Sequence, residues 1–193
     1  MKRIYRNARR IATLSLLSVL VLSLSACPGQ RYDPDEAPRF EEEVLALTNA
    51  ERQARGGLPM ERDPAVDQVA LQHSEDMMIQ RYVAHTNPDG DGPGERLNAA
   101  EIPWVIAGEN VARVRGSLRS NPAEVVVDGW MRSPGHRANI LDSDWTHTGV
   151  GIAIEDRLVY ITQLFINYGD EEEGGEAKAQ ADFVYVSGAL ELE

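Results

Sequence analysis

Three stretches of the chain carry apolar residues at helical spacing, and each predicts an amphipathic helix. The first covers residues 40–55 and ends at a pair of glycines. The second follows Asp63-Pro64, which suits the cap and first turn of a helix, and the third follows Asn121 and should end at Ser133-Pro134-Gly135. The apolar positions of these helices are Phe40, Val44, Leu47, Val66, Val69, Ala70, Met77, Met78, Val126, Val127 and Trp130.

The pattern changes to that of β-strands after Thr148. Residues 149–154 and 158–166 are rich in β-branched and aromatic side chains, and the polar pair at 155–156 between them predicts a hairpin. Residues 85–94 are dense in turn-forming residues and predict a loop, followed by a short helix over 95–100. Residues 183–186 predict one more strand or an ordered tail.

The first 26 residues have the form of an export signal. Five basic residues precede an apolar run over 11–24, which is shorter than the roughly 20 residues that a transmembrane helix needs. The run ends in Leu24-Ser25-Ala26-Cys27, which resembles a bacterial lipobox, where the cysteine is lipidated and becomes the mature N-terminus. We predict a signal peptide over 1–26 and a lipidated tether over 27–38; an ordinary signal peptide cut elsewhere is the alternative.

This leader predicts a protein held in the bacterial cell envelope by acyl chains on Cys27. Pro28, rather than an aspartate, follows the cysteine, which in a Gram-negative host favours the outer membrane. Cys27 is also the one cysteine of the chain, so the folded domain must be stable without a disulfide.

Charge excludes one class of partner. The formal net charge is −12, and the leader holds five of the 19 basic residues and no acid, so the mature chain carries −17. Such a surface repels nucleic acid and anionic headgroups, and the anchor must therefore be the lipid rather than a basic patch. Residues 169–193 form an acidic C-terminal extension.

Several ordered motifs resemble the bacterial branch of the CAP superfamily (cysteine-rich secretory, antigen 5 and pathogenesis-related 1; also called SCP-like extracellular proteins). The resemblance covers roughly residues 40–167 and predicts a domain over 39–168. The motifs are Leu47-Thr48-Asn49-Ala50-Glu51-Arg52, Gly57-Leu58-Pro59, Ala70-Leu71-Gln72-His73-Ser74, Gly108-Glu109-Asn110-Val111-Ala112, Trp130-Met131-Arg132-Ser133-Pro134-Gly135-His136-Arg137-Ala138-Asn139-Ile140-Leu141, Thr146-His147-Thr148-Gly149-Val150-Gly151 and Gln163-Leu164-Phe165.

The resemblance implies an α+β fold, an α-β-α sandwich with a small antiparallel sheet between helical layers. It also implies a cleft lined by His85, Glu109 and His147, with the bacterial-type His136 close by. The chain departs from the eukaryotic pattern in two places. The second acid of that branch is absent near Ser133, and Glu101 stands where a glycine is common.

The chemistry of these side chains leaves the function open. His85 and His147 with one carboxylate form a ligand set for Zn²⁺, although no His-x-x-x-His pair is present. A histidine beside a carboxylate also suits general base catalysis. The fourth histidine, His73, lies in the middle of a predicted helix and is expected to be a packing residue.

We therefore predict a cell-envelope lipoprotein whose His/Glu cleft binds an unidentified ligand, which would be a lipid, a glycan or a peptide. A metal-dependent hydrolase of envelope peptide or protein is one alternative. A non-catalytic interaction module of the envelope is the other. The sequence does not decide whether the protein is an enzyme.

Overall fold

The computed structural model describes residues 32–116, 121–169 and 189–192. The predicted signal peptide, the lipidation site Cys27 and the predicted strand over 183–186 lie outside these residues. The helices of the described part are α1 (Ala37–Gln53), α2 (Pro64–Gln80), α3 (Pro93–Ala99), α4 (Pro122–Arg132) and α5 (Pro134–Leu141), with a 3-10 turn over Pro34–Glu36. The strands are β1 (Glu61–Arg62), β2 (Ile106–Arg115), β3 (His147–Glu155), β4 (Leu158–Asn167) and β5 (Leu190–Leu192).

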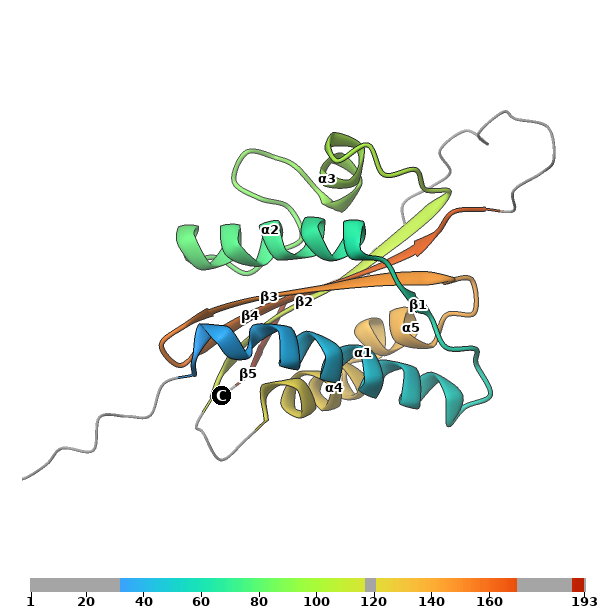
Figure 1. The fold of residues 1–193 in the computed structure, drawn as a ribbon, viewed down its shortest axis with the longest axis horizontal. Coiled ribbons are helices and arrows are strands. Elements are labelled where there is room, and N and C mark those ends of the chain that lie inside the picture. The colour runs from blue at the N-terminus through green and yellow to red at the C-terminus, as the bar shows by residue number, and fades with distance from the viewer. Residues whose placement is uncertain (1–31, 117–120, 170–188, 193) are drawn as a thin grey trace, which may run out of the picture.

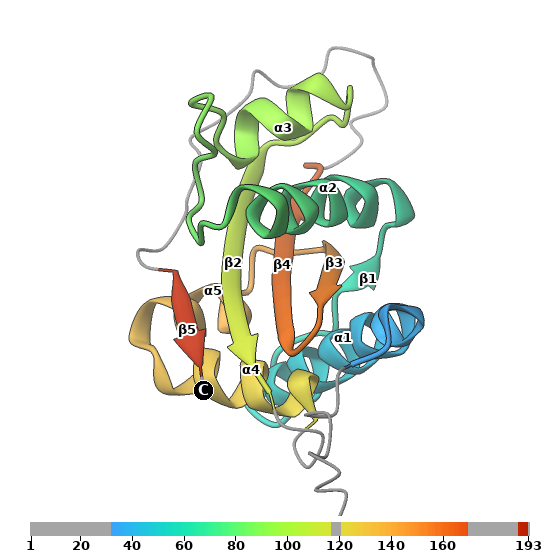
Figure 2. The same cartoon turned by 90° about the vertical axis from the view of Figure 1, so that its left-hand side faces the viewer.

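The five strands form one sheet in the order β1-β3-β4-β2-β5 (Figure 2). The central strands β3, β4 and β2 pair antiparallel, while the short outer strands β1 and β5 run parallel to their neighbours. Helices α2 and α3 lie on one side of the sheet and α1, α4 and α5 on the other (Figure 1). The predicted α-β-α sandwich is therefore confirmed.

Each face of the sheet packs on its own apolar core. The larger core lies under α1 and α4 and includes the fully buried side chains of Phe40 and Trp130. The other face packs against α2 so closely that two positions of β3 must be glycine. A Cβ at Gly151 would lie 2.0 Å from the backbone nitrogen of Leu71, and one at Gly149 would lie 2.4 Å from that of Asp67.

The predicted caps of the second and third helices are present. The side chain of Asp63 accepts a hydrogen bond from the Ala65 N–H at 2.8 Å, and that of Asn121 accepts one from the Ala123 N–H at 3.0 Å. These caps satisfy N–H groups that the first turn of a helix leaves without partners. The helix boundaries follow from local sequence at both sites.

The folded part of the chain begins before the predicted boundary at residue 39. Helix α1 starts at Ala37, and the Tyr32 side chain is buried against Phe40, with the two ring centroids 5.9 Å apart. The Tyr32 N–H also donates to the Asp156 carbonyl at 2.8 Å. The stretch from Tyr32 onward, assigned to the tether by sequence, therefore packs with the domain.

Two larger elements were not predicted. Strand β2 spans Ile106–Arg115, and α5 begins at Pro134, where the sequence was expected only to end a helix. Ser133 serves both as the last cap of α4 and as the first cap of α5, so two helices meet at one residue. None of the helices in the described part has the length and apolarity needed to span a bilayer.

Candidate functional site

Glu109 is a charged residue of strand β2 and is fully buried. It lies in β2 between Ala107 and Val111, which pack in the cores on the α2 side. Side chains two positions apart in a strand point to the same face of the sheet. The Glu109 carboxylate therefore lies on the same side as Ala107 and Val111, which is the side of α2 and α3. A carboxylate in such a position needs partners for both oxygens.

Both carboxylate oxygens of Glu109 have a cationic or hydrogen-bonding partner. The His85 Nδ1–H donates to Oε1 at 2.8 Å, and the Arg96 Nη2 donates to Oε2 at 2.5 Å. The side chains of His85 and Arg96 are each 11% exposed, so the cluster extends from the buried acid to the surface. We call His85, Arg96 and Glu109 the His–Arg–Glu cluster.

Arg96 also holds the loop that carries His85. Its Nη1 donates to the His85 carbonyl at 2.9 Å and to the Asp91 carbonyl at 3.1 Å. One guanidinium in α3 therefore fixes both the acid on β2 and the backbone of the loop before α3. The His85 residue is positioned at its ring by Glu109 and at its backbone by Arg96.

The charge state of the cluster follows from opposing effects. Burial alone would raise the pKa of Glu109, but the Arg96 charge and the His85 hydrogen bond outweigh it and hold that pKa below the usual value. Glu109 therefore stays ionised at neutral pH. Because an ionised carboxylate only accepts hydrogen bonds, the His85 proton lies on Nδ1.

His73 lies behind the cluster on α2 and is a packing residue, as expected. Its side chain is 1% exposed, and its Nε2–H donates to the Ala84 carbonyl at 2.9 Å. Burial lowers the pKa of His73, which favours the neutral ring. The Tyr82 ring packs beside it at 6.1 Å between centroids, and the Tyr82 hydroxyl donates to Asp76 Oδ2 at 2.5 Å.

His136 lies on the opposite face of the sheet from Glu109. It belongs to α5, is 2% exposed, stacks on Trp130 at 6.4 Å between ring centroids, and has its Nδ1 2.8 Å from Ser133 Oγ. Its carbonyl accepts a hydrogen bond from Asn110 Nδ2 at 3.2 Å. Since Asn110 follows Glu109 in the strand, the two side chains point to opposite faces, and His136 is not part of the cluster.

Asn139 joins α5 to β2 below the cluster. Its Nδ2 donates to the Glu109 carbonyl and to Asn110 Oδ1, both at 3.0 Å, and its own carbonyl accepts from the Trp145 indole at 2.7 Å. All of these residues are buried. Asn139 therefore positions the backbone of the residue that carries the buried carboxylate.

His147 is at the start of β3, two strands away from β2, since β4 lies between them. Its side chain is 30% exposed, its Nε2 is 3.8 Å from Glu61 Oε2, and its Nδ1 is 2.9 Å from Thr146 Oγ1. The ring packs edge-on against Tyr168 at 4.8 Å between centroids. The structure thus brings His85 and Glu109 together and places His147 in a different set of contacts.

These positions do not fit the zinc site that His85 and His147 were expected to form. No three histidine, cysteine or acidic residues gather as metal ligands within the described ranges. Both oxygens of Glu109 are already engaged, one of them by the positive charge of Arg96. The positive charge beside Glu109 is therefore supplied by Arg96 and not by a metal ion.

Sequence reasoning missed Arg96 and Asn139. Arg96 resembled an ordinary charged residue of a short surface helix, and Asn139 lay in a motif assigned to a helix end. One signal was available for Arg96. A fully buried acid requires a cation nearby, and in the predicted helix after the His85 loop Arg96 is the basic residue.

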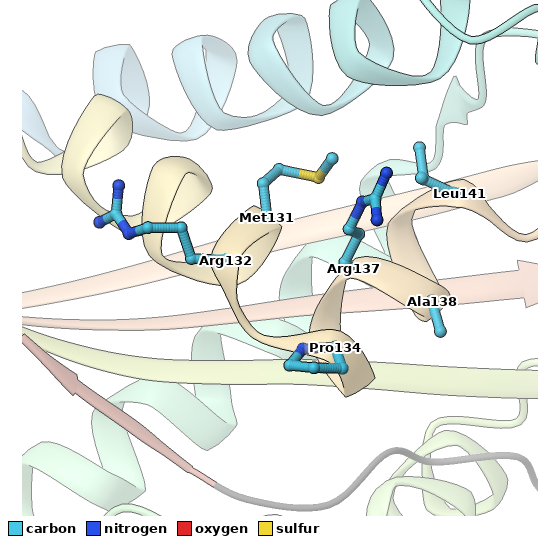
Figure 3. A pocket seen from close by; sticks show the side chains of 6 residues that line it. All are labelled: Met131, Arg132, Pro134, Arg137, Ala138 and Leu141. Carbon is cyan, nitrogen blue, oxygen red and sulfur yellow. The ribbon is translucent and has the colours of Figure 1, made fainter.

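A hollow on the other helical layer is separate from this cluster. It has a volume of about 370 Å³ and lies where α4 meets α5 (Figure 3). Arg137 rises there next to Leu141, while Arg132 extends from α4 in another direction. None of His85, Glu109, His136 and His147 is among the residues that line it, which are Met131, Arg132, Pro134, Arg137, Ala138 and Leu141.

Comparison with known sequences gives one family. Residues 45–165 match the model of the cysteine-rich secretory protein family, CAP. The "Uncharacterized protein YkwD" of Bacillus subtilis (strain 168) is 37% identical over 133 residues, which are 69% of this chain and 49% of the relative. The "Uncharacterized membrane protein YlbC" of the same strain is 39% identical over 126 residues, or 65% of this chain and 34% of the relative. The chain thus spans half or less of the length of these relatives.

Solved structures show the same fold. An extracellular protein containing an SCP domain from Bacillus anthracis str. Ames superposes with a TM-score of 0.60 at 28% identity, covering 70% of this chain and 44% of that one. An outer surface protein from Borrelia burgdorferi superposes with a TM-score of 0.58 at 18% identity, covering 72% of this chain and 98% of that one. The second likeness concerns the fold alone.

Proposed function

Because the chain belongs to the cysteine-rich secretory protein (CAP) family, we propose that it is an exported, envelope-anchored domain that binds a ligand without a metal. The ligand contacts the exposed side of the His–Arg–Glu cluster. The family contains extracellular-type proteins, and fold alone does not set what such a domain binds. The proposal therefore depends on the geometry of the cluster.

The observation that carries the proposal is the fully buried carboxylate of Glu109 between His85 and Arg96. Burying an ion is costly, and a buried ion pair is seldom the most stable way to fill a core. Here the pair fixes the tautomer and the orientation of the His85 imidazole, whose side chain is 11% exposed and whose Nε2 is buried. That arrangement supports a contact site for a polar group of a ligand at the exposed edge of the ring.

Peptide and glycan fragments of the envelope present such polar groups. Amide and hydroxyl groups can donate to the Nε2 of an imidazole whose proton lies on Nδ1, whereas an alkyl chain gains nothing from it. Among the three ligand classes expected from sequence, a peptide or a glycan therefore suits the cluster better than a lipid.

No contact in the described part of the chain favours the metal-dependent hydrolase. That reaction needs an open coordination position, and each oxygen of the carboxylate that would supply a ligand already accepts from a nitrogen donor. A general base would also need a nucleophile nearby. Ser133 contacts His136, and both residues lie on the opposite side of the sheet from the Glu109 carboxylate.

Export and anchoring rest on the leader and on two relatives. The B. anthracis structure is described as extracellular and YlbC as a membrane protein. The basic and apolar leader that ends at Cys27 supports the same compartment for this chain. Acyl chains on Cys27 would keep the domain at the membrane surface.

Ring-nitrogen NMR of the ¹⁵N-histidine-labelled protein tests the binding site. Three probes are titrated separately: a soluble muropeptide, a chitin tetrasaccharide and lauroyl micelles. We expect the muropeptide or the saccharide to move the His85 ring signals in a saturable way, with the His136 signals unchanged. Movement at His147 alone, or no His85 response to any of the three, contradicts the proposal.

Two matched variants sharpen the test. Glu109→Gln removes the ionised acceptor that fixes the His85 tautomer, so we expect weaker binding and a mixture of His85 tautomers. His147→Ala lies outside the cluster and should bind as the wild type does. Zinc titrated into the wild type should give no stoichiometric binding at micromolar concentration, and stoichiometric binding would revive the hydrolase.

A further inference from the structure

The last described residues of the chain form a strand of their own. β5, Leu190–Leu192, pairs parallel with β2, so that Leu190 lies opposite Ala112 and Leu192 opposite Val114. Residues 168–189 separate β5 from the end of the β3–β4 hairpin in sequence. Figure 2 shows β5 at the outer edge of the sheet beside β2, with α4 and α5 on one side.

Both leucines of β5 pack on a glycine of α4. A Cβ built at Gly129 would lie 2.9 Å from Leu190 Cδ2 and 2.7 Å from Leu192 Cδ1. Glycine is unfavourable inside a helix, and here it leaves room for the two side chains. The partly buried leucines also contact the larger apolar core.

The residue between the leucines is recognised on the other face. Glu191 Oε2 accepts from Arg113 Nη2 at 2.5 Å, and Arg113 is the residue directly opposite Glu191 in the strand pair. Three successive side chains of β5, in the order leucine, acid, leucine, therefore each have a specific contact on the domain. We call the Ala112–Val114 edge of β2 together with Gly129 the β5 seat.

The attachment of β5 is small beside that of the other strands. Three residue pairs join it to β2, whereas ten join β2 to β4. Leu190 and Leu192 are only half-buried and Glu191 is exposed. A segment held by so few contacts can leave its seat without disturbing the central hairpin.

We propose that the β5 seat accepts the C-terminal segment of a second copy of the chain by strand addition. Strand addition takes its affinity from backbone hydrogen bonds and its specificity from alternate side chains, which here are the leucines at Gly129 and the acid at Arg113. The chain's own residues 190–192 are the resident occupant.

Tethering predicts how the two occupants compete. A segment joined to its site by a linker acts at an effective concentration of about millimolar, so the resident strand outcompetes a free peptide that binds in the micromolar range. In a variant whose own residues 190–192 bind the β5 seat more weakly, the seat is free to bind a segment from another molecule.

The test uses the full chain carrying Leu190→Ser and Leu192→Ser, and a fluorescent peptide with the sequence of residues 186–193. We expect the double variant to bind the peptide at least about tenfold more tightly than the wild type does, by fluorescence anisotropy. A peptide with serine at both leucine positions should not bind. Equal binding by wild type and variant, or no binding by a folded variant, overturns the proposal.

Gly129→Ala provides the matched control. Alanine stabilises a helix interior relative to glycine, so a loss of peptide binding caused by this change cannot come from a less stable α4. We expect it to weaken peptide binding in the double variant, because the leucine side chains of the peptide must shift to make room for the new Cβ. In the otherwise wild-type chain it should raise amide hydrogen exchange in β5 and leave the β3–β4 hairpin unchanged. Unchanged exchange in β5 would also overturn the proposal.

Discussion

Replacing Arg96 by methionine tests the central claim about the His–Arg–Glu cluster. Methionine keeps much of the side-chain volume but removes the charge and both hydrogen bonds to the loop. Glu109 would then be a fully buried carboxylate whose remaining side-chain partner is His85. Breaking a buried pair by removing one partner costs about 3–5 kcal/mol, and we expect a loss in that range at neutral pH.

The loss should depend on pH in a specific direction. In the wild type the folded pKa of Glu109 lies below the unfolded value of about 4.3, so its stabilisation is present above that pH and is lost as the pH falls through the folded pKa. Without Arg96, burial is opposed only by His85 and His73, and the folded pKa of Glu109 should rise above the unfolded value. The deficit of the variant is then largest at neutral pH and shrinks as Glu109 takes up a proton.

Urea unfolding of wild type and variant at about pH 7 and about pH 5 measures both quantities. Arg96→Lys keeps a positive charge and should lose less stability than Arg96→Met. Arg55→Met removes an exposed pair with Glu51 and should leave stability nearly unchanged. A loss below about 1 kcal/mol at neutral pH, or a loss equal at both pH values, would refute the argument that Arg96 compensates a buried charge.

Three further outcomes are expected. Cys27→Ser should abolish labelling of the protein by a radioactive fatty acid, and labelling equal to wild type would refute the lipobox. Trp130→Ala should lower the free energy of unfolding by about 3–5 kcal/mol, since Trp130 is fully buried; a loss under about 1 kcal/mol in urea would contradict its core position. Gly151→Ala should lower the melting temperature by several degrees, because its Cβ would meet the α2 backbone, whereas an unchanged value would mean that α2 can move away freely.

Much of the fold was readable from sequence because its signals are local. Asp63 and Asn121 cap their helices through bonds to residues two positions away, so the neighbouring sequence contains the whole interaction. Strand β2 was missed because its buried positions include Glu109 and Asn110, which break the apolar pattern of a strand. Helix α5 was missed because Pro134 was interpreted as a stop, although proline also suits the first turn of a helix.

The site was predicted less completely, because its contacts join distant segments. His85 and Glu109 are 24 positions apart and meet as the resemblance implied. His136 and His147 lie outside the cluster because His136 is on the opposite face of the sheet and His147 is on β3. A linear motif does not specify the face or the strand on which a residue lies. Arg96 was missed for a related reason, since a surface charge and a buried counter-ion have the same appearance in a sequence.

The adjacency of Glu109 and Asn110 on β2 limits how the protein can evolve. Deleting one residue of β2 ahead of Glu109 would turn the carboxylate toward α5 and the amide toward His85, because a strand shifted by one position exchanges its faces. Such a deletion would unpair a buried charge and break the Asn139 contacts in one event. Insertions and deletions should therefore be absent from this strand in functional relatives. Changes in ligand preference are left to those residues of the loop between α2 and α3 that Arg96 and Glu109 do not hold.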